Sequence, residues 1–247
     1  MVRGLEPRVV KAPNRGPFTL DGTRTFLVGH EHVAVIDPGP DAEDHVRALS
    51  RVLESTGEIR ILLTHGHPDH SGAARRLARE LSPRVAVSTP FPSPPSEGDV
   101  FTTDQGTLRV VETPGHTRDH LSFHWVEAQA LFVGDLVLGR GNTTWVGEYP
   151  GCVGDYLASL RKVRSLAPRV LYPSHGPPLA SPMEALSAFE SHRLQRIDQV
   201  RIARARHPQL GLDELVGLVY GRAVPPRMAK AARSSVEMIL HHLEGVP

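Results

Sequence analysis

Thr64-His-Gly-His-Pro-Asp-His-Ser-Gly72 is the stretch of this 247-residue chain that says most about its fold and chemistry. Within it, His65, His67, Asp69 and His70 bring three imidazoles and one carboxylate into six positions. Both groups are common ligands of transition metals. The plainer alternative is a polar turn whose histidines are solvated, so the flanking sequence has to support a metal site.

Both flanks of this stretch have regular patterns. Residues 59–64 form a short apolar run rich in branched side chains, which predicts a buried strand. Residues 71–82 carry apolar side chains at helical spacing, which predicts a helix. The cluster therefore lies on a loop between a strand and a helix, where Pro68 restricts the backbone. On such a loop the first two histidines can face one metal position, and Asp69 with His70 a neighbouring one.

Three further candidate ligands, His116, Asp135 and His175, occupy comparable positions downstream. Each follows a predicted strand and has a glycine beside it, in Thr113-Pro-Gly-His116, Val133-Gly-Asp135 and Ser174-His-Gly176. Taken singly, each is better explained as a structural turn residue. Taken together, four chemical sites at the carboxyl ends of strands predict one joint site, because open sheets build their sites at that edge.

The combined set of five histidines and two aspartates resembles the metallo-β-lactamase fold superfamily over about residues 15–180. The resemblance implies an α/β fold of the αβ/βα sandwich type, with two mixed β-sheets flanked by helices. All seven ligand positions are filled, which favours an enzyme over a non-catalytic relative. The implied ligands are His65, His67 and His116 for one metal ion, Asp69, His70 and His175 for a second, and Asp135 as the bridge.

Residues 16–29, 113–120, 134–139 and 173–178 resemble, more narrowly, the β-lactamase-like protein 2 group. Residues 191–197 and 212–220 are similar to the small helical, winged-helix-like domain that this group appends. We therefore predict a catalytic domain over residues 1–182 and a small C-terminal helical, winged-helix-like domain over residues 183–247. Two departures are visible: Arg24 stands where the group usually has asparagine, and the hairpin wing is expected to be shortened.

Hydrophobic periodicity predicts the remaining elements. Helices are expected at residues 41–55, 71–82, 154–167, 183–206, 211–220 and 226–243. Strands are expected at residues 17–28, 32–36, 59–64, 84–88, 100–103, 107–113, 121–126, 130–135 and 169–173. The long loop 139–150 follows Asp135 directly, and a purely structural loop is the alternative to one that shapes a substrate pocket. Its candidate substrate contacts are Asn142, Thr143, Trp145 and Tyr149.

The composition limits the class of protein. The chain is 40% hydrophobic and 22% charged, as is ordinary for globular proteins, and no run approaches the roughly 18 apolar residues of a membrane span. The N-terminus lacks the apolar core of a secretory signal, so we expect a cytoplasmic protein and not a secreted β-lactamase. The single cysteine, Cys152, fits a reducing compartment and is expected to be buried.

The balance of charges is close to neutral. A formal net charge of +1 offers no broad field for a polyanion. Five arginines nevertheless follow one predicted helix, and a solvated helix face is preferred over a grip on a phosphate backbone. They are Arg193, Arg196, Arg201, Arg204 and Arg206.

The ligand types predict the chemistry. Imidazole and carboxylate without thiolate suit two Zn²⁺ ions, and Mn²⁺ or Fe²⁺ would also be accommodated. Two ions roughly 3.5–4 Å apart lower the pKa of a bridging water toward about 7, and the resulting hydroxide is the expected nucleophile. Asp69 is the candidate catalytic residue that orients this hydroxide and carries its proton to the leaving group. His120 is the second candidate catalytic residue, because it could orient a metal ligand or contact the substrate. A purely structural role is the alternative.

We therefore expect a binuclear-metal-dependent hydrolase of a small-molecule ester or thioester, similar to the glyoxalase II-like and thioesterase members of the superfamily. The alternative is a metal-dependent endoribonuclease on single-stranded RNA, an activity found in animal members of the β-lactamase-like protein 2 group. β-Lactamase activity and a non-catalytic nucleic-acid-binding module rank lower. The near-neutral charge and the shortened wing favour the ester substrate over RNA. The sequence does not decide whether the protein forms a homodimer or whether an acyl or a phosphodiester bond is broken.

Overall fold

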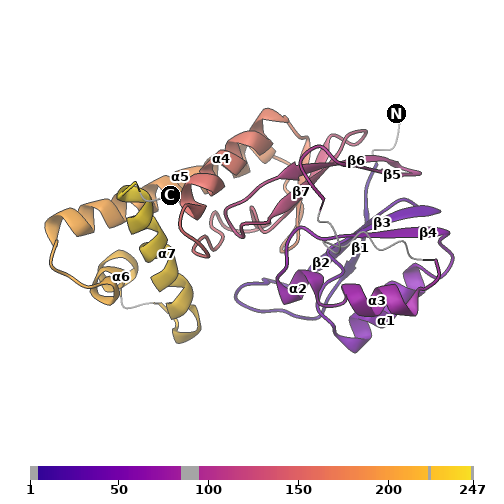
Figure 1. Cartoon of the computed structure of the whole chain (residues 1–247), viewed down its shortest axis with the longest axis horizontal. Helices are drawn as coiled ribbons and strands as arrows, with labels where there is room; N and C mark the ends of the chain where they lie inside the picture. The colour runs from indigo at the N-terminus through magenta and orange to yellow at the C-terminus, as the bar shows by residue number, and fades with distance from the viewer. Residues whose placement is uncertain (1–4, 85–94, 222–223, 246–247) are drawn as a thin grey trace.

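Two β-sheets lie face to face in the computed structural model, which describes residues 5–84, 95–221 and 224–245. The first sheet has the strand order β1-β2-β3-β4 and the second β5-β6-β7-β8-β9. Both sheets are mixed, because β3 pairs in parallel with β4 and β8 with β9, while the other neighbouring pairs are antiparallel. Figure 1 shows the sheets as two layers with helices on their outer sides, which confirms the predicted sandwich.

The element bounds follow the apolar segments of the sequence. The strands are β1 Arg8–Lys11, β2 Arg24–Val28, β3 His32–Ile36, β4 Glu58–Leu62, β5 Val100–Thr103, β6 Gly106–Glu112, β7 Leu121–Trp125, β8 Ala130–Gly134 and β9 Val170–Pro173. The helices are α1 Glu43–Val52, α2 Pro68–Ser71, α3 Ala74–Glu80, α4 Cys152–Ser165, α5 Pro182–Arg206, α6 Leu212–Tyr220 and α7 Ala229–Leu243, with a 3-10 turn, η2, at Pro226–Met228.

Two expected elements differ from those observed, and one observed strand was not expected. The strand expected at residues 17–28 is confined to Arg24–Val28, because the segment before it folds into turns and isolated bridges. The helix expected at 71–82 is interrupted between Ser71 and Ala74, which separates α2 from α3. Strand β1 was not predicted at all. The strand expected at 84–88 falls, apart from its first residue, outside the described residues.

Alternating side chains on the strands form two apolar layers. Phe26 and Phe132 point between the sheets, where they pack with Trp125. Leu27, the neighbour of Phe26, points outward and packs with Leu49 of α1 and other residues of the outer layer. The sandwich is thus the arrangement that buries both faces of the first sheet, one against the second sheet and one against helices.

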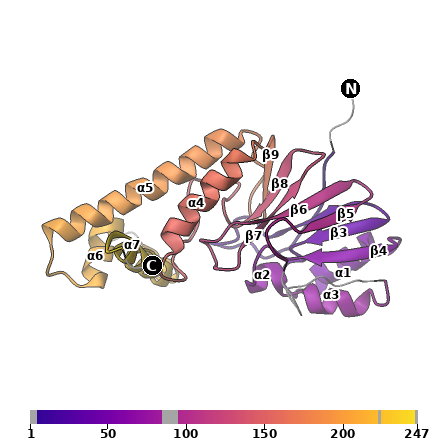
Figure 2. The same cartoon turned by 45° about the horizontal axis from the view of Figure 1, so that its top comes forward.

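A third apolar cluster joins the second sheet to the C-terminal helices. It contains Leu131 of β8, Phe189 of α5 and Val236 of α7. In Figure 2, α5 runs along α4 and extends beyond the sheets, with α6 and α7 on one side of its far half. The predicted boundary at residue 182 therefore falls at the start of a helix that shares its core with the sandwich. Residues 183–221 and 224–245 contain helices and no strand.

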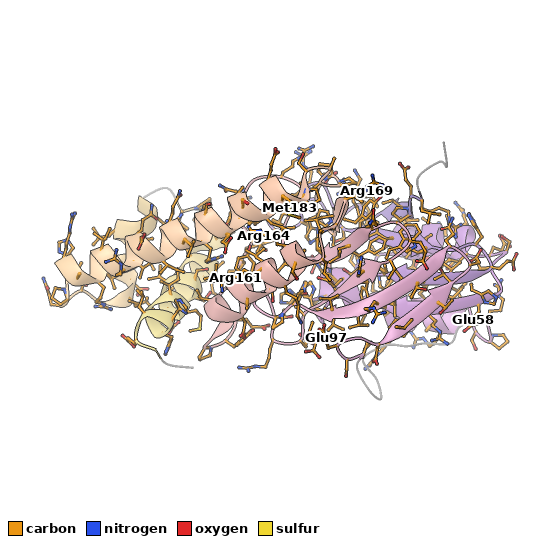
Figure 3. The ribbon with its side chains drawn as sticks, turned by 90° about the horizontal axis from the view of Figure 1, so that it is seen from above. Glu58, Glu97, Arg161, Arg164, Arg169 and Met183 are labelled. Atoms are coloured by element: carbon orange, nitrogen blue, oxygen red, sulfur yellow. The ribbon has the colours of Figure 1, made fainter. Side chains whose placement is uncertain are left out.

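Ion pairs strengthen the contact between α4 and α5. Arg164 lies 2.9 Å from Glu190, and Arg161 lies 3.5 Å from the same carboxylate. Figure 3 shows Arg161 and Arg164 on α4 beside the ribbon of α5. These two arginines are therefore part of the packing between helices. Within the described residues, no helix is long and apolar enough to cross a bilayer.

Candidate metal centre

The predicted ligands lie on four loops at one edge of the sandwich. These loops follow β4, β6, β8 and β9, whose carboxyl ends meet there. The backbone N–H of Leu121 donates to the carbonyl of Thr64 at 2.7 Å, which ties the two sheets together at this edge. Pro68 then starts the single turn of α2, which carries Asp69 and His70. The edge expected from the sequence is thus the place where the seven side chains converge.

His65, His67 and His116 form the first group. Nδ1 of His67 lies 2.9 Å from Nε2 of His65 and 3.1 Å from Nε2 of His116. Two ligands of a tetrahedral zinc ion, with bonds of about 2.0–2.1 Å, are separated by about 3.3 Å. The three ring nitrogens are therefore spaced much as the ligands of one ion would be.

Asp69, His70 and His175 form the second group, and Asp135 lies between the two groups. Nε2 of His175 is 3.2 Å from Oδ2 of Asp69 and 3.4 Å from Oδ1 of Asp135. The other oxygen of Asp135 is 3.6 Å from Nε2 of His70 and 3.6 Å from Nε2 of His116. Oδ2 of Asp135 therefore lies between the two groups, and Oδ1 lies on the side of the second, so that this carboxylate can be shared by both groups.

Several polar atoms in this cluster are buried without a hydrogen-bond partner. They include Nε2 of His70, Nε2 of His175 and Oδ1 of Asp135. Such atoms are costly in a native protein and call for an explanation, such as an ion. Ligand atoms of three overlapping triplets of these side chains lie within 4.8 Å of one another. The donor set, nitrogen and oxygen without sulfur, fits a pair of divalent transition-metal ions.

Burial and the mutual charges of the cluster set its protonation. Burial acts to raise the pKa of Asp135, but the charges of His175 and His70 hold that pKa well below its usual range. Burial acts to lower the pKa of His70, but Asp135 and Asp37 raise it well above the ordinary value. The metal-free cluster therefore contains an ionised Asp135 beside a protonated His70, and a bound cation would replace that proton.

Asp37 is a candidate site residue that the sequence analysis does not predict. It is fully buried and accepts hydrogen bonds at 2.8 Å from the N–H and the hydroxyl of Thr64, from the hydroxyl of Ser174 and from Nδ1 of His70. Because Nδ1 of His70 donates to this carboxylate, Nε2 is left to face the cluster. The φ angle of Asp37 is 50°, a left-handed value that is uncommon outside glycine and is held by these bonds.

The signal for Asp37 was present in the sequence. Ile36-Asp37-Pro38-Gly39 ends a strand on a carboxylate followed by Pro-Gly, which is the same kind of pattern that predicts the candidate ligands. Asp37 lies outside the motifs that carry the family resemblance, which is why the prediction does not include it.

His120 lies behind the ligands. Its Nδ1 is 2.9 Å from the hydroxyl of Thr113, and its Nε2 accepts a hydrogen bond of 3.2 Å from the backbone N–H of Asp135. Burial, reinforced by the charge of His116, lowers the pKa of His120 to about 3, so the ring is neutral. Gly134 makes room for it, because a Cβ at that position would lie 2.7 Å from Nε2 of His120. Both ring nitrogens are thus engaged by protein groups.

A cavity of about 660 Å³ opens beside the ligands. His67, Asp69, His116 and Asp135 form its floor, and its walls are largely apolar. Among the described residues that line it, none is Lys or Arg. One wall comes from the end of α6 and from the segment that leads into α7, which the sequence did not associate with the site.

The predicted substrate contacts occupy different places. Thr143 and Trp145 line the cavity, whereas Asn142 is exposed and is not among the lining residues. The hydroxyl of Tyr149 donates to Asp155 at 2.8 Å, and its ring is covered by the guanidinium of Arg118, 4.3 Å from the centroid. The structure therefore brings two of the four loop residues to the cavity.

The loop of residues 143–147 connects the ligands to the C-terminal helices. The carbonyl of Trp145 accepts a hydrogen bond of 2.8 Å from Nδ1 of His116, which leaves Nε2 facing the cluster. The indole N–H of Trp145 donates to Ser234 of α7 at 3.1 Å. Arg193 of α5, only 3% exposed, donates to the carbonyl of Thr144 at 2.9 Å. One loop thus contacts both a candidate ligand and two C-terminal helices.

Comparisons with known proteins identify relatives over most of the chain. A relative in Caenorhabditis elegans, named beta-lactamase-like protein 2 homolog, is 31% identical over 93% of this chain and 81% of its own length. A Paecilomyces divaricatus protein, named atrochrysone carboxyl ACP thioesterase AgnL7, is 34% identical over 94% of this chain and 77% of its own length.

A solved structure extends the similarity to the whole fold. The beta-lactamase domain protein of Burkholderia ambifaria superposes with a TM-score of 0.82, at 23% identity, over 97% of this chain and 86% of that one. Residues 19–92 and 84–175 match the model of the metallo-beta-lactamase superfamily. The chain therefore belongs to the metallo-beta-lactamase superfamily, whose fold and candidate His/Asp metal site it carries.

Proposed function

We propose that the protein is a binuclear-metal-dependent hydrolase of small-molecule esters or thioesters. The observation that carries the proposal is the convergence of seven potential metal ligands beside a cavity with largely apolar walls, whose floor four of them form. A thioester is favoured over an oxygen ester by the name of the Paecilomyces divaricatus relative, a thioesterase.

Two Zn²⁺ ions are the proposed occupants, with Mn²⁺ or Fe²⁺ as alternatives. The residues that would hold them are His65, His67 and His116 in one group and Asp69, His70 and His175 in the other, with Asp135 shared. The chemistry that such a pair supplies when bound is a water deprotonated near neutral pH and a polarised oxygen on the electrophile.

Asp69 is the proposed proton carrier. Its side chain is 29% exposed and borders the cavity, so it can reach both water and substrate. Although burial acts to raise the pKa of Asp69, the ring of His175, 3.2 Å away, and that of His70 keep it lowered, and the carboxylate is ionised at neutral pH. In the proposed reaction, water gives a proton to Asp69 while its oxygen forms a bond to the acyl carbon. The carbon–sulfur bond then breaks, and the thiol leaves with that proton.

His120 is proposed as a positioning residue. Its Nε2 accepts from the backbone N–H of Asp135, so it fixes the peptide that carries the shared carboxylate. Thr143, which borders the cavity, is the loop residue that we propose as a substrate contact.

The endoribonuclease alternative has less support. Arg193 is buried, Arg196 lies over the ring of Tyr220, Arg201 pairs with Asp198 of its own helix, and Arg204 donates to the carbonyls of Pro208 and Leu210. Four of the five arginines on α5 are therefore engaged within the protein. A strand of RNA would need several free cations along its path.

Parallel assays of zinc-loaded protein test the proposal, one with hexanoyl-N-acetylcysteamine and one with a labelled single-stranded RNA. The protein is expected to hydrolyse the thioester, and Asp69→Asn is expected to lower kcat by about 100-fold or more, because a positioned general base contributes that much. The matched control is Asp41→Asn, an exposed aspartate that pairs with Arg76. RNA cleavage that depends on Asp69, without thioester turnover, would contradict the proposal.

A further inference from the structure

The cavity beside the metal ligands is built from two distant parts of the chain. Phe18, Leu138 and Trp145 come from the sandwich, and Met228, Ala231 and Ala232 from η2 and α7. The two alanines are small, and they lie on a face of α7 that borders the space. The room available to a substrate therefore depends on C-terminal residues that contribute none of the candidate ligands.

The volume of the cavity exceeds what a short acyl group needs. A water molecule occupies roughly 30 Å³ of liquid, so a cavity of about 660 Å³ holds on the order of twenty non-hydrogen atoms. An acetyl or lactoyl group would fill only a fraction of this space. The remainder would be occupied by water against apolar walls, which is unfavourable.

The walls also select by charge. Beyond the floor formed by the candidate ligands, the described lining residues include no Asp, Glu, Lys, Arg or His. A charged group at the far end of an acyl chain would lose its hydration and find no oppositely charged partner among these described wall residues. A neutral alkyl or aromatic group would instead bury apolar surface against Phe18, Trp145 and Met228.

From this geometry we infer that the substrates carry neutral, mainly apolar acyl groups of about eight or more carbons, bound against the C-terminal helices. Met228, Ala231 and Ala232 set the upper limit of acyl length. The inference rests on the proposed hydrolase function and adds the class of acyl group and the residues that select it.

A series of acyl-N-acetylcysteamine thioesters from two to twelve carbons tests the acyl class with zinc-loaded full-length protein. We expect kcat/KM to rise by about two- to fourfold for each added methylene up to about eight carbons, because each methylene is removed from water. Suberyl thioester has the length of octanoyl but ends in a carboxylate, and its kcat/KM is expected to be at least about 30-fold lower. A flat series, or equal rates for suberyl and octanoyl, would overturn the inference.

Opposite changes to the wall test the residues. Ala231→Phe is expected to lower kcat/KM for decanoyl by about 30-fold or more and for acetyl by less than about threefold. Met228→Ala is expected to move the optimum to a longer chain. The matched control is Ala229→Phe, on an exposed position of the same helix that does not line the cavity. If Ala231→Phe and Ala229→Phe give the same length profile, α7 does not limit the acyl group.

A binding measurement separates this inference from the proposed reaction. Trp145 lines the cavity, whereas the other tryptophan, Trp125, is fully buried between the sheets. Octan-1-ol is expected to change the tryptophan fluorescence of the full-length protein at concentrations at least about tenfold below butan-1-ol, and Ala231→Phe to abolish that difference. If the protein hydrolyses thioesters, but neither kcat/KM nor alcohol binding depends on chain length, only this inference fails. If the protein binds octan-1-ol more tightly than butan-1-ol but hydrolyses no ester or thioester, the proposed reaction fails.

Discussion

Asp37 fixes the orientation of His70 and holds the backbone from which the ligand loop starts. Asp37→Asn replaces an acceptor of four hydrogen bonds with a group that also donates, and it removes the charge opposite His70. We expect the affinity for the second metal ion to fall by about 10–100-fold, as is typical when such outer partners are changed. Competition with a chelating dye measures this, with Asp213→Asn at an exposed position as the control. Unchanged affinity would mean that Asp37 serves only the fold.

His120 gives the metal-free protein a characteristic dependence on pH. Burial lowers its pKa to about 3, whereas in the unfolded chain histidine titrates near 6.5. Between these values the unfolded state binds a proton that the native state does not, so stability is lost as the pH falls below 6.5. The contribution of this group is up to about 1.4 kcal/mol per pH unit.

His120→Gln removes this titrating group. Between pH 6.5 and 4.5, the free energy of unfolding of the variant is expected to fall less steeply than that of the wild type, as measured by urea denaturation. His207→Gln, at an exposed position, is expected to keep the wild-type slope. Parallel curves for wild type and His120→Gln would show that His120 is protonated in the native state.

The candidate ligands could be predicted from the sequence because each one follows a strand at the same edge of a sheet. Strand ends are readable from short apolar runs, and the chemistry of histidine and aspartate is readable from their side chains. The direction of a side chain is not readable in this way. Tyr149 lies in the expected loop, but it turns toward Asp155 and away from the cavity, and nothing in the local pattern indicates that.

Among the elements, the loop of residues 143–147 links the candidate metal centre to α5 and α7. Arg193→Met removes the charged donor to the Thr144 carbonyl and leaves that oxygen with only a 3.4 Å hydrogen bond from the hydroxyl of Thr143. Because the next carbonyl, that of Trp145, orients His116, we expect both kcat and metal affinity to fall by about tenfold. A metal titration and steady-state kinetics of the same preparation provide the readouts.

Arg201→Met is the control for that variant, since Arg201 lies on the same helix and pairs only with Asp198 among the contacts described. A loss of thermal stability in Arg193→Met without any change in metal affinity would contradict the positioning role and leave a structural one.

The elements themselves were largely predictable, because long periodic segments dictate them. The errors have local causes. β1, Arg8–Lys11, is short and only partly buried, so its apolar pattern is weak. Residues 17–23 have the apolar content of a strand but turn back on themselves, through a bridge between Gly16 and Leu20. Such turns depend on contacts elsewhere in the chain, which periodicity does not report.

The sandwich and the C-terminal helices share one apolar cluster. Leu131 of the sheet, Phe189 of α5 and Ile239 of α7 belong to it. A protein truncated after residue 182 is therefore expected to expose this surface and to lose cooperative folding. The full chain is expected to unfold in one transition, with equal calorimetric and van't Hoff enthalpies. Two separate transitions in calorimetry, or a soluble and cooperative 1–182 fragment, would contradict the shared core.

The cavity illustrates what the sequence could not supply at this scale. Phe18 and Met228 are more than two hundred positions apart in the chain, yet both line the same space. The sequence predicts a separate C-terminal domain, because its helices resemble those of a winged-helix domain. Only the packing of that domain against the sandwich makes its apolar face part of the candidate active site.

Metal-dependent hydrolysis of an apolar acyl thioester can be measured by titrating the metal-free protein with Zn²⁺. The rate of octanoyl-N-acetylcysteamine hydrolysis would be followed together with the metal content of the protein. We predict that the rate rises with bound metal and saturates at about two ions per chain, as for a two-metal site. Absence of turnover at that occupancy, or turnover that persists after complete chelation, would contradict the account.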